Sequence, residues 1–403
     1  MSTILLTISE PGSRSGALGP SPRGLPLLRL GFRPFYLAAA LAAVALMALW
    51  PAVLLGHVRP ASGLAPSLWH AHEMVFGCIA AVVVGFLFTA GKVWTGRATP
   101  RGPGLAALAL LWLAGRVAGL LAPGLVFLVV DSAFLAVVAT IFAVIVVRSH
   151  NWRNAGVALL LALLAAVNLA FHVAATGGLA ELAMRPLHAA LALLILLESV
   201  IGGRVIPAFT RSANPGLALV GRAWLDRLAL GATALGLVLW LCEAAPAAAA
   251  AVLGVAALAQ AARLAGWRPW VARQRPILWI LHAAYAWIPL GLGLLAAACA
   301  GLAAPSAGVH ALAVGATGGL VIGMLTRTAR GHTGRTLLAS RAEVTAYVLV
   351  MAAAVLRVAA ALEPHWWTVA VCAAGTCWIA AFTFYLWRFA PWLVAARLDG
   401  KDG

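Results

Sequence analysis

Long apolar runs, separated by short polar breaks, organise the sequence from about residue 35 to residue 389. A helix needs about 20 apolar residues to cross the hydrocarbon core of a bilayer. Cutting the chain at its clusters of Pro, Gly and Arg predicts twelve such helices, over residues 35–56, 69–91, 104–121, 125–147, 155–176, 186–208, 223–243, 247–264, 277–302, 309–326, 342–361 and 367–389. The pattern therefore predicts an all-α polytopic membrane protein with one transmembrane helical domain over residues 33–392.

The composition agrees with this prediction. Of the 403 residues, 64% are hydrophobic and 10% are charged. A soluble domain of this composition would have more apolar surface than it could bury, so the composition argues against a soluble protein. Residues 1–32 contain Pro, Gly and Arg but lack the apolar core and cleavage site of a signal peptide. We predict that they form a flexible cytoplasmic tail, and that residues 393–403 form a second cytoplasmic tail.

The positive charge is distributed as a topology signal. A net charge of +17 could indicate a nucleic-acid partner. With the N-terminus inside, however, almost every Lys and Arg falls on the cytoplasmic side, and the outer loops keep little beyond Arg59 and Arg185. This is the positive-inside distribution of membrane proteins. It predicts an inner-membrane protein with both termini in the cytoplasm, in contact with the bilayer and not with nucleic acid.

Two of the predicted helices repeat each other. Residues 72–97 and 310–335 align without a gap, and eight of the 26 positions are identical. The identities include a histidine (His72 and His310), two glycines and a terminal Thr-Gly-Arg, which apolar composition alone does not explain. A similar offset relates Arg116 to Arg357.

A fainter third copy lies between these two, with His188 at the start of the sixth predicted helix. We therefore predict three four-helix units in parallel topology, over residues 33–148, 153–264 and 275–390. A pseudo-threefold ring of these units would place the second, sixth and tenth helices at equivalent positions facing the centre.

The repeated histidines are candidate ligands. Two neutral imidazoles at one depth can bind a haem iron from both sides or help to bind copper. Arg116 and Arg357 lie at the outer ends of their helices, where they could pair with haem propionates or anchor in lipid headgroups. Glu73 could hold a His ring or accept a proton, and Asp131 could pair with Arg116. His70 and His72 differ by about 200° around the helix, so that only one of them can face inward.

Several other polar residues are candidates within the predicted helices. A His in a membrane helix either binds a ligand or hydrogen-bonds to a neighbouring helix. The further histidines with this choice are His70, His172, His188, His282 and His332. Glu198 lies near the bilayer centre, where it is either a proton relay or a protonated acid bonded across helices. Residues 202–211 suggest a broken helix end, with Arg204 reaching the inner surface.

Four stretches carry a resemblance to a known family: LGFRPFY (30–36), WHAHEMVFG (69–77), GGRVIPAFT (202–210) and VHALAVGATGGLVIGMLTRTARGHTGR (309–335). Together they resemble the NnrS family over nearly the whole membrane portion. The resemblance implies a bacterial inner-membrane protein that contains haem, expected to be b-type, and copper. It also implies a link to nitric oxide metabolism, to denitrification and to resistance against nitrosative stress. The residues that match the family's motifs are His70, His72, Glu73, Arg204, His310, His332 and Arg335.

The predicted architecture also resembles that of haem–copper oxidases and nitric oxide reductases, in which the second and tenth helices supply the low-spin haem ligands. The seventh predicted helix here contains no His, which argues against a binuclear centre of that kind. Fold alone does not decide function. Three functions stay open: a haem and copper redox enzyme that acts on nitric oxide, a non-catalytic sensor or protective carrier, and a twelve-helix secondary transporter. The sequence does not identify the electron donor.

Overall fold

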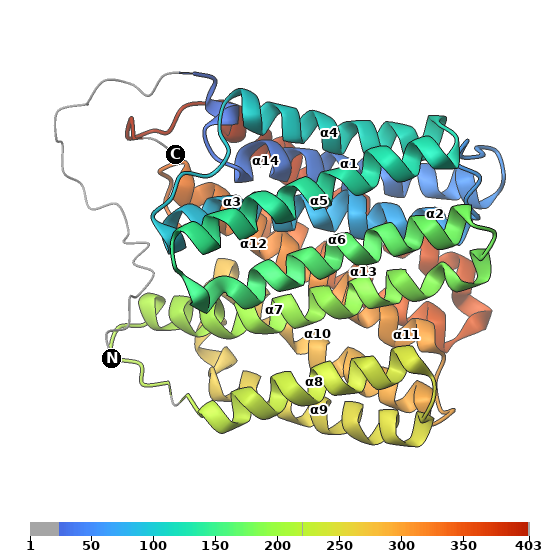
Figure 1. The fold of residues 1–403 in the computed structure, drawn as a ribbon. Helices are drawn as coiled ribbons and strands as arrows, with labels where there is room; N and C mark the ends of the chain where they lie inside the picture. The colour runs from blue at the N-terminus through green and yellow to red at the C-terminus, as the bar shows by residue number, and fades with distance from the viewer. Residues whose placement is uncertain (1–23, 220, 402–403) are drawn as a thin grey trace. The chain divides into compact units, whose positions relative to one another are not determined.

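The computed structural model describes residues 24–219 and 221–401, and these residues form helices without any strand. Most of the predicted N-terminal tail, residues 1–23, lies outside them. The described residues contain twelve helical segments that are long and apolar enough to cross a membrane, which confirms the predicted class (Figure 1). The chain is a multi-pass membrane protein.

The chain divides into two compact units. The first, which we call the N-terminal unit, comprises the described residues up to 193 together with residues 332–335 and 385–401. The second, the central unit, comprises residues 194–331 and 336–384. Helices α7, α12 and α14 each contribute to both units.

The N-terminal unit is built from the first five membrane segments. Its helices are α1 (Phe32–Leu54), α2 (Pro66–His72), α3 (Ala80–Thr95), α4 (Pro103–Leu121), α5 (Gly124–Arg148) and α6 (Ala155–Thr176), followed by the first part of α7 (Met184–Ala213). Its long-range packing joins α1 with α3, α4 with α5, and α5 with α6. Two of these helices begin with Pro, which suits the first helical position because its missing N–H has no partner there.

The central unit contains the remaining segments. Its helices are the rest of α7, α8 (Ala223–Cys242), α9 (Pro246–Gly266), α10 (Pro276–Cys299), α11 (Pro305–His310), α12 (Gly319–His332), α13 (Arg341–Leu362) and most of α14 (Trp367–Val394). Helix α9 packs against α8 and α10, and α10 also packs against the segment around α11. A capping box of Ser340 and Glu343 starts α13.

A π-helix interrupts two of the membrane segments. The turn η2 (Glu73–Ile79) directly follows His72, and η6 (Ala311–Gly318) directly follows His310. The two histidines that the sequence repeat aligns therefore occupy the same position, the last α-helical residue before a π-helical stretch. π-Helical turns are rare overall, but those that occur are often found at functional sites.

Helix α7 differs from the sequence prediction. It continues as an α-helix to Ala213, so the predicted break at residues 202–211 is wrong. The two glycines of this segment serve close packing instead. A Cβ at Gly202 would lie 3.0 Å from the Tyr285 ring, and a Cβ at Gly203 would collide with the guanidinium of Arg263.

Arg33 joins the beginning of the N-terminal unit to its end. Its side chain is buried at the start of α1, and Nη1 donates to the carbonyl oxygens of Leu393 and Ala395, each at 2.8 Å. These carbonyls belong to the end of α14 and the residues after it, where a helix leaves its last acceptors without internal partners. The guanidinium therefore supplies the donors that this helix end requires.

Candidate metal centre

His72 lies in the interior of the N-terminal unit. Its side chain is 0% exposed and is enclosed by the rings of Phe76, Phe127 and Phe171, with centroids at 5.1, 5.1 and 4.6 Å from its own. Phe76 lies on η2, whereas the other two rings come from α5 and α6. The imidazole is thus placed in dry, apolar surroundings, where every polar atom needs a partner.

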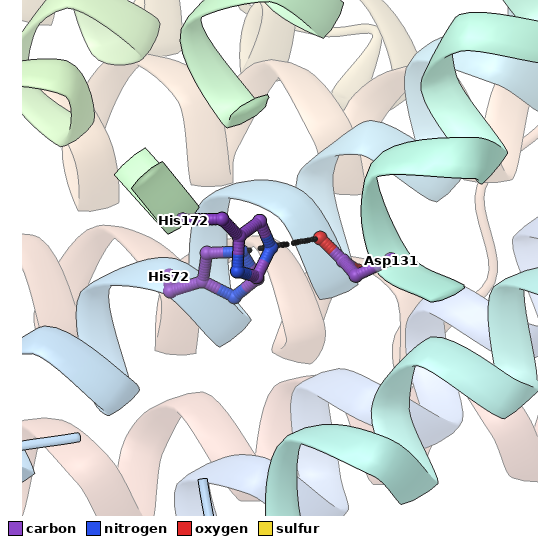
Figure 2. Close-up of side chains that lie close together, drawn as sticks. All are labelled: His72, Asp131 and His172. Carbon is purple, nitrogen blue, oxygen red and sulfur yellow. Dashed lines mark hydrogen bonds and ion pairs between the residues drawn. The ribbon is translucent and has the colours of Figure 1, made fainter. Parts of the chain in front are cut away.

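Two further ligand-type side chains converge on this imidazole. Asp131 of α5 and His172 of α6 are both buried, and His172 Nε2 lies 2.9 Å from Asp131 Oδ2. His72 Nε2 lies 3.3 Å from the same oxygen. Figure 2 shows the two imidazoles side by side with the carboxylate directed at them.

The spacing of these three groups matches the requirement of a metal ion. One ligand atom from each of His72, Asp131 and His172 lies within 4.8 Å of the other two. Ligands at the 2.0–2.1 Å bond lengths of zinc to nitrogen are separated by about 3.3 Å in a tetrahedral site. The separations of His172 Nε2 and His72 Nε2 from Asp131 Oδ2, 2.9 and 3.3 Å, are close to this value.

Asn168 completes the inner surface of the cluster. It lies one helical turn before His172 on α6, and its Nδ2 donates to Asp131 Oδ2 at 2.8 Å. Its Oδ1 lies 3.1 Å from His72 Nε2. Asn168 thus contacts two of the three candidate ligands from one side chain.

Glu73 and Arg116 form the outer layer. His72 Nδ1 lies 3.3 Å from Glu73 Oε1, to which Arg116 Nη1 donates at 2.8 Å. Arg116 Nη2 also donates to Asp131 Oδ1, which confirms the predicted pairing of Arg116 with Asp131. One guanidinium therefore bridges the two carboxylates, with one charge-assisted hydrogen bond to each.

These contacts are compatible with either neutral tautomer of the His72 ring, and one of the two suits a metal ion. With its proton on Nδ1, the ring donates to Glu73 Oε1, and Nε2 carries a lone pair that faces Asp131 Oδ2 and Asn168 Oδ1. A cation among these three atoms, such as a bound metal ion, would stabilise that tautomer.

Glycines provide the space for the charged side chains. A Cβ at Gly77 would lie 2.8 Å from Arg116 Nη1, and one at Gly115 would lie 2.9 Å from Asp131 Oδ1. A Cβ at Gly119 would approach Glu73 Oε1 to 3.1 Å. The carbonyl of Gly77, within η2, accepts a hydrogen bond from Trp112 Nε1 at 2.9 Å. Small residues of η2 and α4 therefore leave room for this cluster.

A comparison with protein-family models finds one match, to the family described as "NnrS protein", over residues 26–397. The chain belongs to the NnrS family. The matched region contains every helix described above, so the predicted resemblance is confirmed for the whole membrane portion. A comparison with curated proteins gives no match.

The two histidines of the stretch WHAHE, residues 69–73, contribute unequally to the site. His72 and Glu73 belong to the cluster, whereas the ring of His70 stacks on Trp50 with centroids 4.3 Å apart. The prediction that only one of the two histidines faces inward is therefore confirmed. Arg116 and His172, which the sequence also proposed, belong to the same cluster.

The other predicted residues have separate environments. His310 Nδ1 lies 2.7 Å from the carbonyl oxygen of Ser306, and His282 Nε2 lies 3.0 Å from the Thr210 hydroxyl. Arg357 is half-buried, and its Nη1 has no hydrogen-bond partner within the described part of the chain.

The remaining predicted residues lie on both units. In the N-terminal unit, the His332 ring lies 5.4 Å from that of Phe32, and Arg335 covers the Trp392 ring at 4.2 Å. His188 is half-buried, and Arg204 of the central unit is exposed. The contacts described above for His332 and Arg335 do not include a residue of the His72 cluster.

Sequence reasoning missed Asn168 and treated Asp131 only as a partner of Arg116. A usable signal was present, because Asn168 and His172 are four residues apart in NLAFH and so share one face of a helix. An Asp in the apolar run of residues 124–148 was the second signal.

Proposed function

We propose that this NnrS-family protein is an inner-membrane metalloprotein of the nitric oxide response, in which His72, Asp131 and His172 hold a copper ion. The observation that supports the proposal most directly is the convergence of His72 Nε2 and His172 Nε2 on one oxygen of Asp131, in dry surroundings. The family's link to nitric oxide suggests that the bound copper ion in turn binds nitric oxide.

The donor set fits copper. Two imidazole nitrogens and a carboxylate oxygen suit copper, zinc and iron, and three protein ligands leave a further position open on the ion. When bound, copper would supply a binding position for nitric oxide and one-electron chemistry.

The protein's own residues would prepare the site. Glu73 holds the proton of His72 on Nδ1, which directs Nε2 toward the ion, as outer partners of metal ligands commonly do. The rings of Phe76, Phe127 and Phe171 exclude water around the imidazole. Nitric oxide is small and apolar, so it can reach a site within the bilayer from the lipid.

The haem that the resemblance implies does not fit His72 as it stands. A porphyrin face needs open space at the ligating nitrogen, but Asp131 and Asn168 lie within 3.3 Å of Nε2. His310 is the second candidate, because its Nδ1–H donates to a backbone carbonyl, as ligating histidines commonly do, and this contact puts the lone pair on Nε2. The buried Nη1 of Arg357, unpartnered among the described residues, suits an anionic group such as a propionate. We therefore propose a b-type haem in the central unit.

Both a reductase-like enzyme and a non-catalytic sensor or carrier are compatible with this site. Reduction of nitric oxide requires protons, and Glu198 is the candidate to supply them. Its Oε2 is buried without a hydrogen-bond partner in the part of the chain that the structure describes. The proposal also keeps the predicted orientation, with both termini in the cytoplasm.

The test is metal analysis of the purified protein, together with electron paramagnetic resonance after oxidation of bound copper to Cu²⁺, with His70→Ala as the matched control for His72→Ala. We expect about one copper per chain in the wild type and in His70→Ala, and loss of the copper signal in His72→Ala. Addition of nitric oxide should change the copper signal of the first two only. Equal copper content in all three proteins would refute the assignment of the site.

A further inference from the structure

We infer that Arg116 determines the charge of the ion that this site accepts, so that the wild-type cluster prefers a monovalent ion, Cu⁺, over divalent ions. The inference rests on the proposed metal site. It assigns to Arg116 the role of a specificity-determining residue, although Arg116 does not itself bind the metal.

The argument begins with the charges inside the cluster. Glu73 and Asp131 contribute two negative charges, and Arg116, which bridges them, contributes one positive charge. Ligating histidines are neutral. The site without metal therefore carries −2 + 1 = −1.

An ion of charge +1 brings this sum to zero, whereas an ion of charge +2 leaves +1. The Arg116 side chain is 8% exposed, and those of Glu73 and Asp131 are 1% and 3% exposed. A net charge in such surroundings is costly, because the described residues that contact the cluster bring no further counter-charge.

The other contacts of the cluster leave the sum unchanged. Asn168 is uncharged, and the three phenylalanine rings around His72 carry no formal charge. The donor atoms alone would favour divalent ions, because carboxylates are hard ligands and imidazole accepts Zn²⁺ as well as copper. The charge sum is thus the property that would reverse the preference.

The guanidinium is held in a manner that Lys could not reproduce. Its Nη1 and Nη2 reach separate carboxylates, Glu73 and Asp131, and Gly77 and Gly115 provide the space for them. A planar guanidinium can serve two carboxylates at once, whereas an ammonium acts as a point charge.

The experiment compares binding of Cu⁺ and Zn²⁺ alone, each by competition with a chromogenic chelator under anaerobic conditions. Four purified proteins are needed: wild type, Arg116→Gln, Glu73→Gln, and the double variant. Removing the Arg116 charge gives a site of −2, so the ratio of Cu⁺ to Zn²⁺ affinity should fall by about 100-fold. Glu73→Gln gives a metal-free site of charge 0. It should raise the ratio of Cu⁺ to Zn²⁺ affinity and weaken the binding of both metals.

The double variant provides the decisive control. It restores a charge of −1 without Arg116, and its ratio should return to within about threefold of the wild type. Glu73→Gln and the double variant decide the question even if Arg116→Gln proves too unstable to purify. If all four proteins bind metal with the same ratio of Cu⁺ to Zn²⁺ affinity, the role of Arg116 is overturned and the metal site still stands. If the wild type binds neither Cu⁺ nor Zn²⁺, and His72→Ala shows the same lack of binding, both the metal site and this inference are overturned.

Discussion

The segments that contain His72 and His310 have one backbone design and two different surroundings. In each, a short α-helix ends at the histidine, a π-helical turn follows, and a longer α-helix completes the span. After His72 comes Glu73, which is linked to Arg116, whereas the residue after His310 is Ala311. The comparison teaches that a histidine before a π-helix is a shared scaffold, and that the following residue and the neighbouring helices determine what it can bind.

The glycines of the two π-helices show the same difference. Gly77 in η2 makes room for Arg116, whereas the aligned Gly315 in η6 lies against the indole of Trp287. Gly318 lies similarly against Trp378, whose ring a Cβ would approach to 2.6 Å. One π-helix therefore faces charged groups within the N-terminal unit, and the other serves close packing within the central unit.

The largest expected effect is a difference in stability between variants of the two repeated arginines, Arg116 and Arg357. Arg116→Ala leaves two buried carboxylates without their counter-charge and should lower the free energy of unfolding by about 3–5 kcal/mol. Arg357→Ala removes a half-buried group with no described ion pair and should cost less than about 1 kcal/mol. Thermal unfolding in detergent measures both. Equal losses would show that the Glu73–Arg116–Asp131 contacts do not stabilise the N-terminal unit.

The next effect concerns the copper. His172→Ala removes one of three proposed ligands and should weaken copper binding by about 100-fold, at least as much as loss of an outer partner does. His310→Ala should leave the copper affinity unchanged, because His310 is not among the described contacts of the cluster. Equilibrium dialysis with copper analysis checks both variants. Loss of copper from the second variant alone would move the site to the central unit.

The two aligned glycines should respond in opposite ways. Gly315→Ala places a Cβ against the rigid indole of Trp287 and should cost about 1–3 kcal/mol of stability, without loss of copper affinity. Gly77→Ala places its Cβ 2.8 Å from Arg116 Nη1 and should weaken copper binding by about tenfold. Unfolding and dialysis measurements on each variant separate the two effects. The same outcome for both glycines would remove the distinction between the π-helices.

The smallest effect on binding is expected at Glu198. Glu198→Gln preserves shape and removes the ability to deliver a proton, so copper content and nitric oxide binding should stay at the wild-type level. The rate of nitric oxide consumption by the reduced protein should fall strongly if the protein is a reductase. Unchanged consumption in this variant would exclude Glu198 as the proton donor.

The fold was largely predictable because the bilayer constrains it so strongly. Residues 104–121 were predicted as one span and form Pro103–Leu121, and residues 223–243 form Ala223–Cys242. Apolar length and the Pro at several helix starts determine such boundaries. The π-helices were not predictable, because one inserted residue shifts the helical phase, and in segments this apolar a shift of phase does not stand out.

The candidate site was predictable only in part. His72 and His172 were both recognised as metal-ligand candidates, and the pairing of Arg116 with Asp131 was predicted correctly. The sequence could not show that all four side chains meet, because they lie on different helices whose rotation about their axes depends on packing. Gly77, Gly115 and Gly119 allow that packing, but glycine is common throughout membrane helices, so these three do not stand out in the sequence.

The bond from Arg33 to the carbonyls of Leu393 and Ala395 has a consequence for synthesis. The ribosome delivers Arg33 long before its acceptors, because 360 and 362 residues separate it from them in the sequence. The N-terminal unit can therefore form this contact only after every helix of the central unit has been synthesised. A nascent chain that stops before residue 393 would contain Arg33 without these two acceptors.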